Sequence, residues 1–292
     1  MKKTKQNLIN QFINDKNLSQ KEKDTIVGTT LGDSHIRWSL NKKTVSLSYG
    51  YAKKFYAIYV LENLKNLSHY ISPTENQNLD KRYKKIRYSY TFSLRSLSSL
   101  IVFAKLFTKP IVKNNKESFI KVLPSYKILF ELITPRALAF WIMDDGHKYK
   151  RGGITLCTDS FTLAEVKRLI KVLTTKFNLI CTIHTKKSND KSSVYHRIYI
   201  VADSLPLLYS LVFEFFCSEM LYKIKFNTKT PLTLSQSKKN IKARAERLAL
   251  KIWKLKHGNI SLPSKSPRIY STNPRAVKAR LARQALKKVE SK

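Results

Sequence analysis

Residues 138–146 read LAFWIMDDG, an apolar run that ends in two adjacent aspartates and a glycine. Just upstream, Thr134 and Pro135 supply a helix N-cap and a favourable first-turn proline, so the run is predicted to be a helix. Carboxylates at the C-terminal end of a helix lie at the negative pole of its dipole, which is an unfavourable place for them. The two aspartates therefore suggest a binding role at the end of a core helix.

A second segment has the same plan. Residues 24–36 read DTIVGTTLGDSHI, an apolar helix that also ends in a carboxylate, and a capping box of Ser19 and Glu22 precedes it. Asp33 and Asp145 lie 112 residues apart, about one small-domain length. The sequence therefore predicts two similar halves.

Alternating segments follow each apolar helix. Strands are predicted at 45–50 and 85–92 in the first half and at 152–158, 179–185 and 193–201 in the second. In the strand at 85–92 we expect one face to be buried, formed by Ile86, Tyr88, Tyr90 and Phe92. The opposite face carries Lys85, Arg87, Ser89 and Thr91. A further helix starts at the Thr162–Glu165 capping box, so each half reads helix, strands, helix, strands, helix, an α+β fold.

The glycines indicate how the two apolar helices pack. The chain has only seven glycines, yet Gly28 and Gly32 both fall within the first apolar helix, where each costs about 1 kcal/mol relative to alanine. Small residues four apart let two helix backbones approach closely, with Ala139 expected on the facing helix. Packing of these helices would bring Asp33 and Asp145 side by side.

Two neighbouring carboxylates repel each other, and bound divalent cations reverse that repulsion. A carboxylate pair with Mg²⁺ beside a basic sheet is suited to in-line phosphodiester hydrolysis. The alternative is that DDG is merely an acidic turn that ends a core helix, but two such motifs at repeat spacing favour the metal site.

Composition limits the partners. The chain has 56 Lys and Arg against 19 Asp and Glu, a net charge of +37, which predicts a polyanionic partner. No segment is long and apolar enough for a membrane helix, and no apolar region of a signal peptide follows the basic N-terminus. Cys157, Cys181 and Cys217 lack the spacing of a zinc site or a disulfide framework.

Residues 26–34 and 138–146 resemble the two copies of the motif that names the LAGLIDADG homing endonucleases, in their two-motif, single-chain branch. The resemblance spans roughly residues 8–228, because TPRALAFWIMDDG, LCTDSFTLAEVKRL and SEMLYKI follow in the order of the second-repeat signature. It implies two pseudo-symmetric αββαββα repeats that form a saddle over DNA. The predicted domains are residues 1–115, 116–230 and a basic helical tail at 231–292.

The same resemblance implies catalysis. Asp33 and Asp145 would bind Mg²⁺, with Mn²⁺ as a substitute, for cleavage of a long, nearly unique double-stranded DNA site that leaves 3′ overhangs. Lys121 and Lys223 match the basic residues that the family places near each scissile phosphate, although phosphate anchoring without catalysis is the alternative. Asp144 is expected to cap or support rather than to coordinate metal.

Departures from the family pattern occur at the motifs. The first motif ends in Ser34 instead of glycine, and Phe140 occupies a place where a small residue often packs. Both predict a helix interface that is less close or shifted. His35 and His147 each lie two residues beyond a motif aspartate, where they either contact a phosphate or a metal-bound water or are solvated loop residues.

Sequence recognition is expected on the outward faces of the sheets, which offer side chains able to reach base edges or phosphates. The candidates are Lys85, Arg87, Ser89 and Thr91 in the first half and Tyr195, Arg197 and Tyr199 in the second. A solvated strand face is the alternative.

The tail is denser in charge than the rest, with 17 Lys and Arg against two Glu in residues 238–292. A stripe of Ile241, Ala245, Leu248, Ile252 and Leu255 predicts an amphipathic helix that ends at Gly258. Asn273 and Pro274 then begin a second basic helix. The tail either clamps flanking duplex, binds structured intron or ribosomal RNA, or is a partly ordered extension.

Three functions therefore remain open from the sequence. They are a site-specific DNA endonuclease, an intron RNA maturase, and a structural RNA-binding protein such as a ribosome-associated one. Two motifs in one chain predict a monomer. Abundant Lys, Asn, Ile and Tyr with few Gly suggest an AT-rich coding sequence, as in mitochondria or plastids, and a group I intron origin fits the family.

Overall fold

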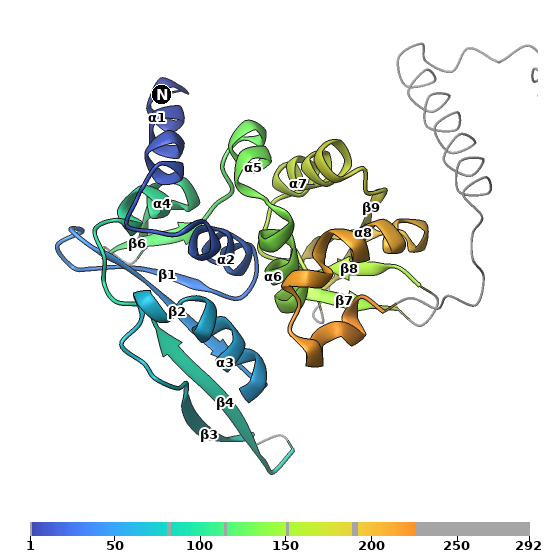
Figure 1. The fold of residues 1–292 in the computed structure, drawn as a ribbon, viewed down its shortest axis with the longest axis horizontal. Helices are drawn as coiled ribbons and strands as arrows, with labels where there is room; N and C mark the ends of the chain where they lie inside the picture. Colours follow the sequence, from blue (N-terminus) through green and yellow to red (C-terminus); the bar gives the residue numbers. More distant parts are fainter. Residues whose placement is uncertain (1, 81–82, 114–115, 150–151, 189–191, 226–292) are drawn as a thin grey trace, which may run out of the picture. The chain divides into compact units, whose positions relative to one another are not determined.

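The computed structural model describes residues 2–80, 83–113, 116–149, 152–188 and 192–225. They belong to one compact unit, Met1–Lys229, shown in Figure 1. The predicted tail at 231–292 lies outside the described residues. In the part of the chain that is described, no helix has the length and apolar character needed to cross a membrane.

Two segments share the order of elements that was predicted. The first comprises α2 (Gln20–Leu31), β1 (His35–Trp38), β2 (Val45–Tyr51), α3 (Lys54–Asn63), β3 (Thr74–Asp80), β4 (Lys85–Ser93) and α4 (Leu100–Phe107). The second comprises α6 (Pro135–Asp145), β7 (Gly146–Lys148), β8 (Ile154–Leu156), α7 (Leu163–Phe177), β9 (Cys181–Lys187), β10 (Val194–Ile200) and α8 (Leu205–Val212). Both read αββαββα, which confirms the predicted α+β repeats.

In the described part of the chain, four further helices and strands lie outside the repeats, and short 3₁₀ turns lie within the repeats or after them. They are α1 (Lys2–Ile13), β5 (Thr108–Lys113), β6 (Lys116–Lys121) and α5 (Tyr126–Leu132), and the turns η1 (Lys65–Leu67), η2 (Ala202–Ser204), η3 (Phe213–Phe215) and η4 (Ser218–Lys223). The β5–β6 hairpin packs on the first repeat, where Trp38 stacks on Phe119 with ring centroids 5.0 Å apart. The predicted second domain, which starts at residue 116, begins with β6.

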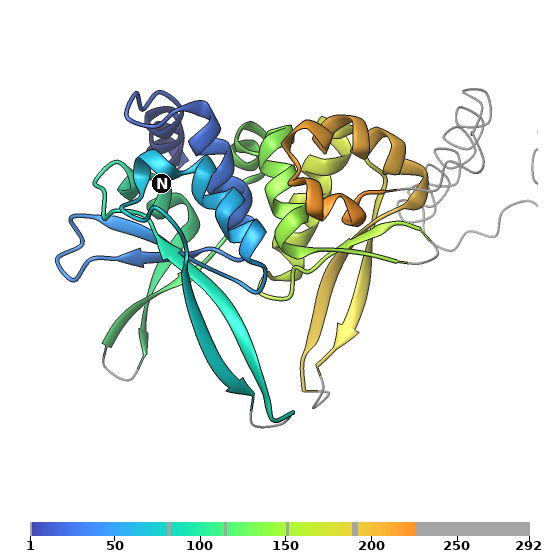
Figure 2. The same ribbon diagram turned by 60° about the horizontal axis from the view of Figure 1, so that its bottom comes forward.

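The two sheets have matching topology. Their strand orders are β1-β2-β4-β3 and β7-β8-β10-β9, and every neighbouring pair is antiparallel. Figure 2 shows both sheets on the same side of the helices, with the β3–β4 and β9–β10 hairpins extending away from them. The core lies between the helices and the inner halves of these sheets.

The helix starts agree with the sequence. Ser19 with Glu22 and Thr162 with Glu165 form the predicted capping boxes, and the hydroxyl of Thr134 accepts from the N–H of Ala137. Helix α2 ends at Leu31, so Gly32 is its C-cap and not an interior residue as predicted.

Burial of β4 is only partly as predicted. Phe92 is buried, but Ile86 and Tyr88 are 56% and 46% exposed, so the expectation that they face the core was wrong. Strand β2 pairs with β4 only from Tyr90 to Ser93, and further out β4 pairs with β3 alone. The outer half of β4 therefore extends as a two-stranded ribbon beyond the helices that would bury it.

Candidate functional site

The site is organised by direct packing of α2 on α6. A Cβ built on Gly28 would lie 2.3 Å from the carbonyl oxygen of Ala137 and 2.7 Å from the Cβ of Phe140. Only glycine permits this approach, as the sequence predicted. The facing residues are Ala137 and Phe140, however, and not the predicted Ala139.

Phe140 does not loosen the interface, contrary to expectation. Its ring stacks on Tyr59 of α3 with centroids 5.8 Å apart, so only its Cβ lies against Gly28. The other departure, Ser34, is 2% exposed and its hydroxyl lies 3.1 Å from the hydroxyl of Thr30. Both substitutions are therefore accommodated without separating the helices.

Asp144 occupies the point where the two helix ends meet. A Cβ on Gly32 would lie 2.4 Å from the Cβ of Asp144, which leaves room there for glycine alone. Asp144 Oδ2 accepts from the backbone N–H of Asp33 at 3.1 Å, and Oδ1 accepts from the hydroxyl of Tyr56 at 2.5 Å. Both oxygens are thus engaged within the protein, in agreement with the supporting role expected of Asp144.

Asp33 and Asp145 are influenced by the same two lysines, and the charge of Asp33 also acts on Asp145. Desolvation and the negative charge of Asp33 raise the pKa of Asp145 to about 7, with Lys121 and Lys223 opposing the shift. Desolvation also raises the pKa of Asp33. The raised pKa values mean that the ionised forms of the two carboxylates are disfavoured. A bound cation would stabilise those ionised forms.

The two candidate lysines have equivalent positions at the ends of the two motif helices. Lys121, at the end of β6, donates through Nζ to the carbonyl oxygens of Thr30 and Gly32 at 2.8 and 3.0 Å. Lys223, in η4, donates to the carbonyl oxygens of Met143 and Asp144, the latter at 3.2 Å. Each ammonium therefore satisfies carbonyls at the negative end of its helix and lies beside the carboxylate pair.

The donor set fits Mg²⁺. Among the described residues, no group of three or more His, Cys, Asp and Glu side chains could hold a metal ion by itself. Mg²⁺ commonly binds through one or two carboxylates and completes its shell with water and substrate phosphates. Asp33 and Asp145 are suited to that mode, whereas each oxygen of Asp144 already accepts a hydrogen bond from within the protein.

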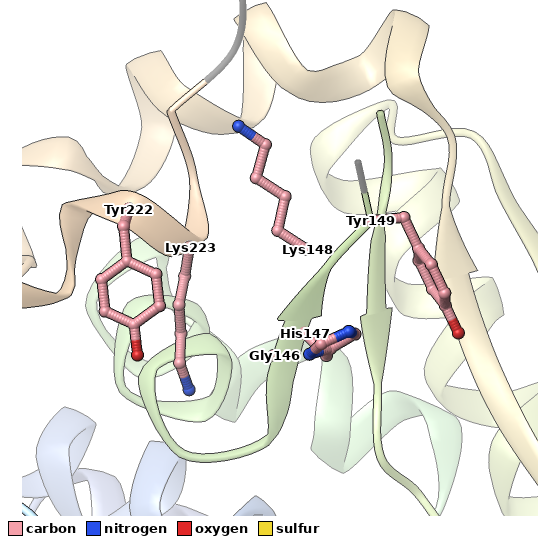
Figure 3. Close-up of a pocket in the computed structure, with 6 residues that line it drawn as sticks. All are labelled: Gly146, His147, Lys148, Tyr149, Tyr222 and Lys223. Atoms are coloured by element: carbon pink, nitrogen blue, oxygen red, sulfur yellow. The ribbon is translucent and has the colours of Figure 1, made fainter. Parts of the chain in front are cut away.

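A hollow of about 470 Å³ opens beside Lys223. It is lined by Gly146, His147, Lys148, Tyr149 and Tyr222 in addition to that lysine (Figure 3). Figure 3 shows the hydroxyl of Tyr222 and the amine of Lys223 directed the same way. His147 is exposed on β7, and His35 is exposed at the matching position on β1. The polar lining of the hollow suits an anionic ligand close to the carboxylate pair.

The four candidates on β4 share one face, as predicted, because they alternate along the strand. They are Lys85, Arg87, Ser89 and Thr91. Two of them already bind side chains of β3: Arg87 Nε lies 2.8 Å from Asp80 Oδ2, and Thr91 Oγ1 accepts from Asn76 at 2.8 Å. Lys85 and Ser89 lie opposite Asp80 and Asn76 in the strand register.

The three candidates on β10 also share a face, formed by Tyr195, Arg197 and Tyr199. Ile198 and Ile200, which alternate with them, are fully buried. Tyr199 stacks on His184 with centroids 4.3 Å apart and donates its hydroxyl to the carbonyl of Gly152. Arg197 donates through Nε to Asp159 Oδ1 at 2.6 Å and through Nη2 to Oδ2.

Sequence reasoning missed the residues that hold these groups in place. Tyr56, on α3, and Asp159, in the β8–α7 connection, each contact a candidate residue that is distant in the chain. Neither carries a local signal, since a tyrosine in an apolar helix and an aspartate in a turn are common. The roles of Tyr56 and Asp159 become apparent only from the tertiary packing.

Comparison with known proteins agrees with this geometry. The profile of the LAGLIDADG DNA endonuclease family matches residues 23–208. A probable intron-encoded endonuclease 1 of Wickerhamomyces canadensis is 30% identical over 220 residues, which cover 72% of this chain and 86% of the relative. The cytochrome b mRNA maturase bI2 of Debaryomyces hansenii is 38% identical over 104 residues, 36% of this chain and only 37% of the maturase.

A solved structure is similar as well. The homing endonuclease I-WcaI, bound to its DNA recognition sequence, superposes with a TM-score of 0.61 at 26% identity, over 72% of this chain and 88% of that one. The matched family profile covers α6, most of α2 and both four-stranded sheets. This chain therefore belongs to the LAGLIDADG DNA endonuclease family.

Proposed function

We propose that the protein is a site-specific double-strand DNA endonuclease that hydrolyses phosphodiester bonds. The observation that carries the proposal is the junction of α2 and α6, where the charges of Asp33, Lys121 and Lys223 all act on Asp145 and the two lysines occupy equivalent positions. Each motif helix thus has one of these aspartates and one of these lysines at its C-terminal end, which suits a cut in each strand of a duplex. Asp33 and Asp145 are proposed as the metal ligands.

Mg²⁺, or Mn²⁺ in its place, would supply Lewis-acid stabilisation and an activated water when bound. The residues of the chain have simpler tasks. Asp33 and Asp145 hold the negative charge that attracts the cation. Lys121 and Lys223 are aimed at the same junction and are proposed to stabilise charge that develops on the scissile phosphates.

Duplex DNA is the proposed substrate because polar and basic side chains cover the outward face of both sheets. Phosphate contacts would position the duplex and base contacts would specify the site. The high positive charge of the chain adds sequence-independent attraction to DNA. Since one chain contains both motifs, we propose that it acts as a monomer.

A second candidate is an intron RNA maturase. It is favoured by the similarity to two cytochrome b mRNA maturases, from Debaryomyces hansenii and Saccharomyces cerevisiae, and by the dense charge of residues 238–292. A structural RNA-binding role, for example with ribosomal RNA, rests on the charge alone. The intron-encoded relatives also support the proposal that the protein acts in an organelle.

The experiment that separates these functions measures cleavage and binding with the full chain. One arm incubates it in Mg²⁺ with duplex DNA that spans the exon junction of the gene carrying this reading frame. The other arm measures binding to the intron RNA. Double-strand cleavage supports the endonuclease. Tight binding of the intron RNA without any DNA cleavage would establish the RNA-binding candidates instead.

A further inference from the structure

The ion pair of Arg197 and Asp159 is unusual for a surface arginine. Arg197 lies on the outward face of β10, yet its side chain is only 19% exposed. Asp159 binds it through two oxygens, at Nε and at Nη2. Such bidentate pairs fix the plane of the guanidinium, which an ordinary surface lysine or arginine does not achieve.

The carboxylate is itself held firmly in place. Asp159 follows Thr158, which is fully buried and donates its hydroxyl to the carbonyl oxygen of His196 at 2.5 Å. Phe161 closes the turn by donating its N–H to the carbonyl of Thr158 at 3.1 Å. The connection is thus anchored to β10 one residue before Arg197, so the acid and the arginine move as a unit.

Among the residues that the structure describes, the pairing leaves a defined set of donors of Arg197 free. A guanidinium has five N–H bonds, and Asp159 uses one on Nε and one on Nη2. The remaining three include one on Nη2 and one on Nη1 that point in parallel along the free edge. That edge matches the O6 and N7 acceptors that guanine presents in the major groove.

The surroundings provide room for a base pair edge. Arg197 lines a hollow of about 430 Å³ on the outward face of the second sheet, together with Thr155, His184, Thr185 and Lys186. In the strand register His184 lies directly opposite Arg197. Ile183 and Tyr149 complete the lining, so the guanidinium has mostly polar neighbours on the surface that the proposed function assigns to DNA.

We propose that Asp159 is a specificity-determining residue, which holds Arg197 so that its free edge reads one guanine of the target site. This inference rests on the proposed function. Asp159 acts through Arg197 and is a positioning residue, since it would not touch the DNA itself. The side chain of Arg87 is 61% exposed, against 19% for Arg197, so the proposal is confined to the second repeat.

The test is a selection from randomised duplex DNA with the full chain, without divalent cation so that DNA is bound but not cut. Base preferences are compared position by position for the wild type, Arg197→Ala, Asp159→Asn and Glu131→Gln. The last removes one charge from an exposed residue of α5, in the helical layer, and is the matched control. Circular dichroism of each variant verifies folding.

For the wild type we expect the selected DNA to contain guanine at one particular position. With Arg197→Ala, all four bases should be selected equally at that position. Asp159→Asn should lower that preference by about 5-fold to 160-fold, the range of one bidentate base contact, and leave the other positions unchanged. Glu131→Gln should have no effect on any position.

Two results would overturn the inference. In the first, Asp159→Asn retains the guanine preference or strengthens binding to all sequences, which would mean that Asp159 only shields a phosphate-binding arginine. In the second, Arg197→Ala changes overall affinity but no base preference. A wild type that selects no sequence at all would instead refute the proposed function, and the inference with it.

Discussion

The substitution Gly28→Ala tests whether close contact of α2 and α6 holds the site together. The new methyl group would lie 2.3 Å from the carbonyl oxygen of Ala137, whereas ordinary contact begins at 3.4 Å. The helices must therefore separate by about 1 Å, because a backbone carbonyl cannot rotate away.

Two opposing contributions determine how much Gly28→Ala lowers the free energy of unfolding. Overpacking of a well-packed interface costs about 1–3 kcal/mol, and the upper end applies because the clash is with backbone. Replacing glycine by alanine within a helix returns about 1 kcal/mol. A net loss of about 2 kcal/mol should lower the melting temperature by about 4–8 °C in a domain of this size.

Thermal denaturation followed by circular dichroism measures this loss, and Gly50→Ala provides the matched control. A Cβ on Gly50, in β2, would have only Thr91 Cγ2 nearby, at 3.6 Å. That variant should melt at or slightly above the wild-type temperature, because alanine has less conformational entropy to lose. If Gly28→Ala melted as the control does, the close helix packing described here would be wrong.

Three further outcomes follow from the junction. Tyr56→Phe removes the donor to Asp144 Oδ1 and should cost about 1–3 kcal/mol in chemical denaturation, while Tyr70→Phe at an exposed tyrosine should cost nothing measurable. Asp144→Asn should retain cleavage where Asp145→Asn loses it, and the opposite result would reverse their assignment. Because the pKa of Asp145 is raised from 3.8 to about 7, the folded state binds this proton more tightly than the unfolded chain, so ionisation destabilises the fold as pH rises through that range. Without divalent cation, Asp145→Asn should therefore be more stable than the wild type by up to about 4 kcal/mol near pH 8. Near pH 4 the two proteins should be equally stable. Melting curves recorded over a series of pH values measure both differences.

The sequence predicted the repeats because local signals and global fold agree there. Capping boxes mark where α2 and α7 begin, and buried aliphatic residues alternate along β10 with polar ones. Gly28 was informative because an interior helix glycine is costly, so a close approach had to compensate for it. The paired aspartates were predictable in the same way, because carboxylates at the negative end of a helix are unfavourable unless something compensates for them.

The remaining features depend on tertiary context. Alternation in β4 indicated a buried face, but the strand extends beyond the helical layer, so Ile86 and Tyr88 remain exposed. The facing residue of Gly28 depends on the rotation of α6, which periodicity does not define to one residue. The hydrogen bonds that Lys121 and Lys223 donate to helix carbonyls join segments about 80 to 90 residues apart, and no local pattern encodes them.

The most direct measurement is cleavage of the duplex target in Mg²⁺ by the wild type, Asp33→Asn and Asp145→Asn, with each strand labelled separately. Asp15→Asn, at a residue before α2 and outside the junction, is the matched control. If the paired carboxylates are essential, the wild type and the control should cut both strands. Each motif variant should cut both strands much more slowly. Undiminished cleavage by either motif variant would contradict it.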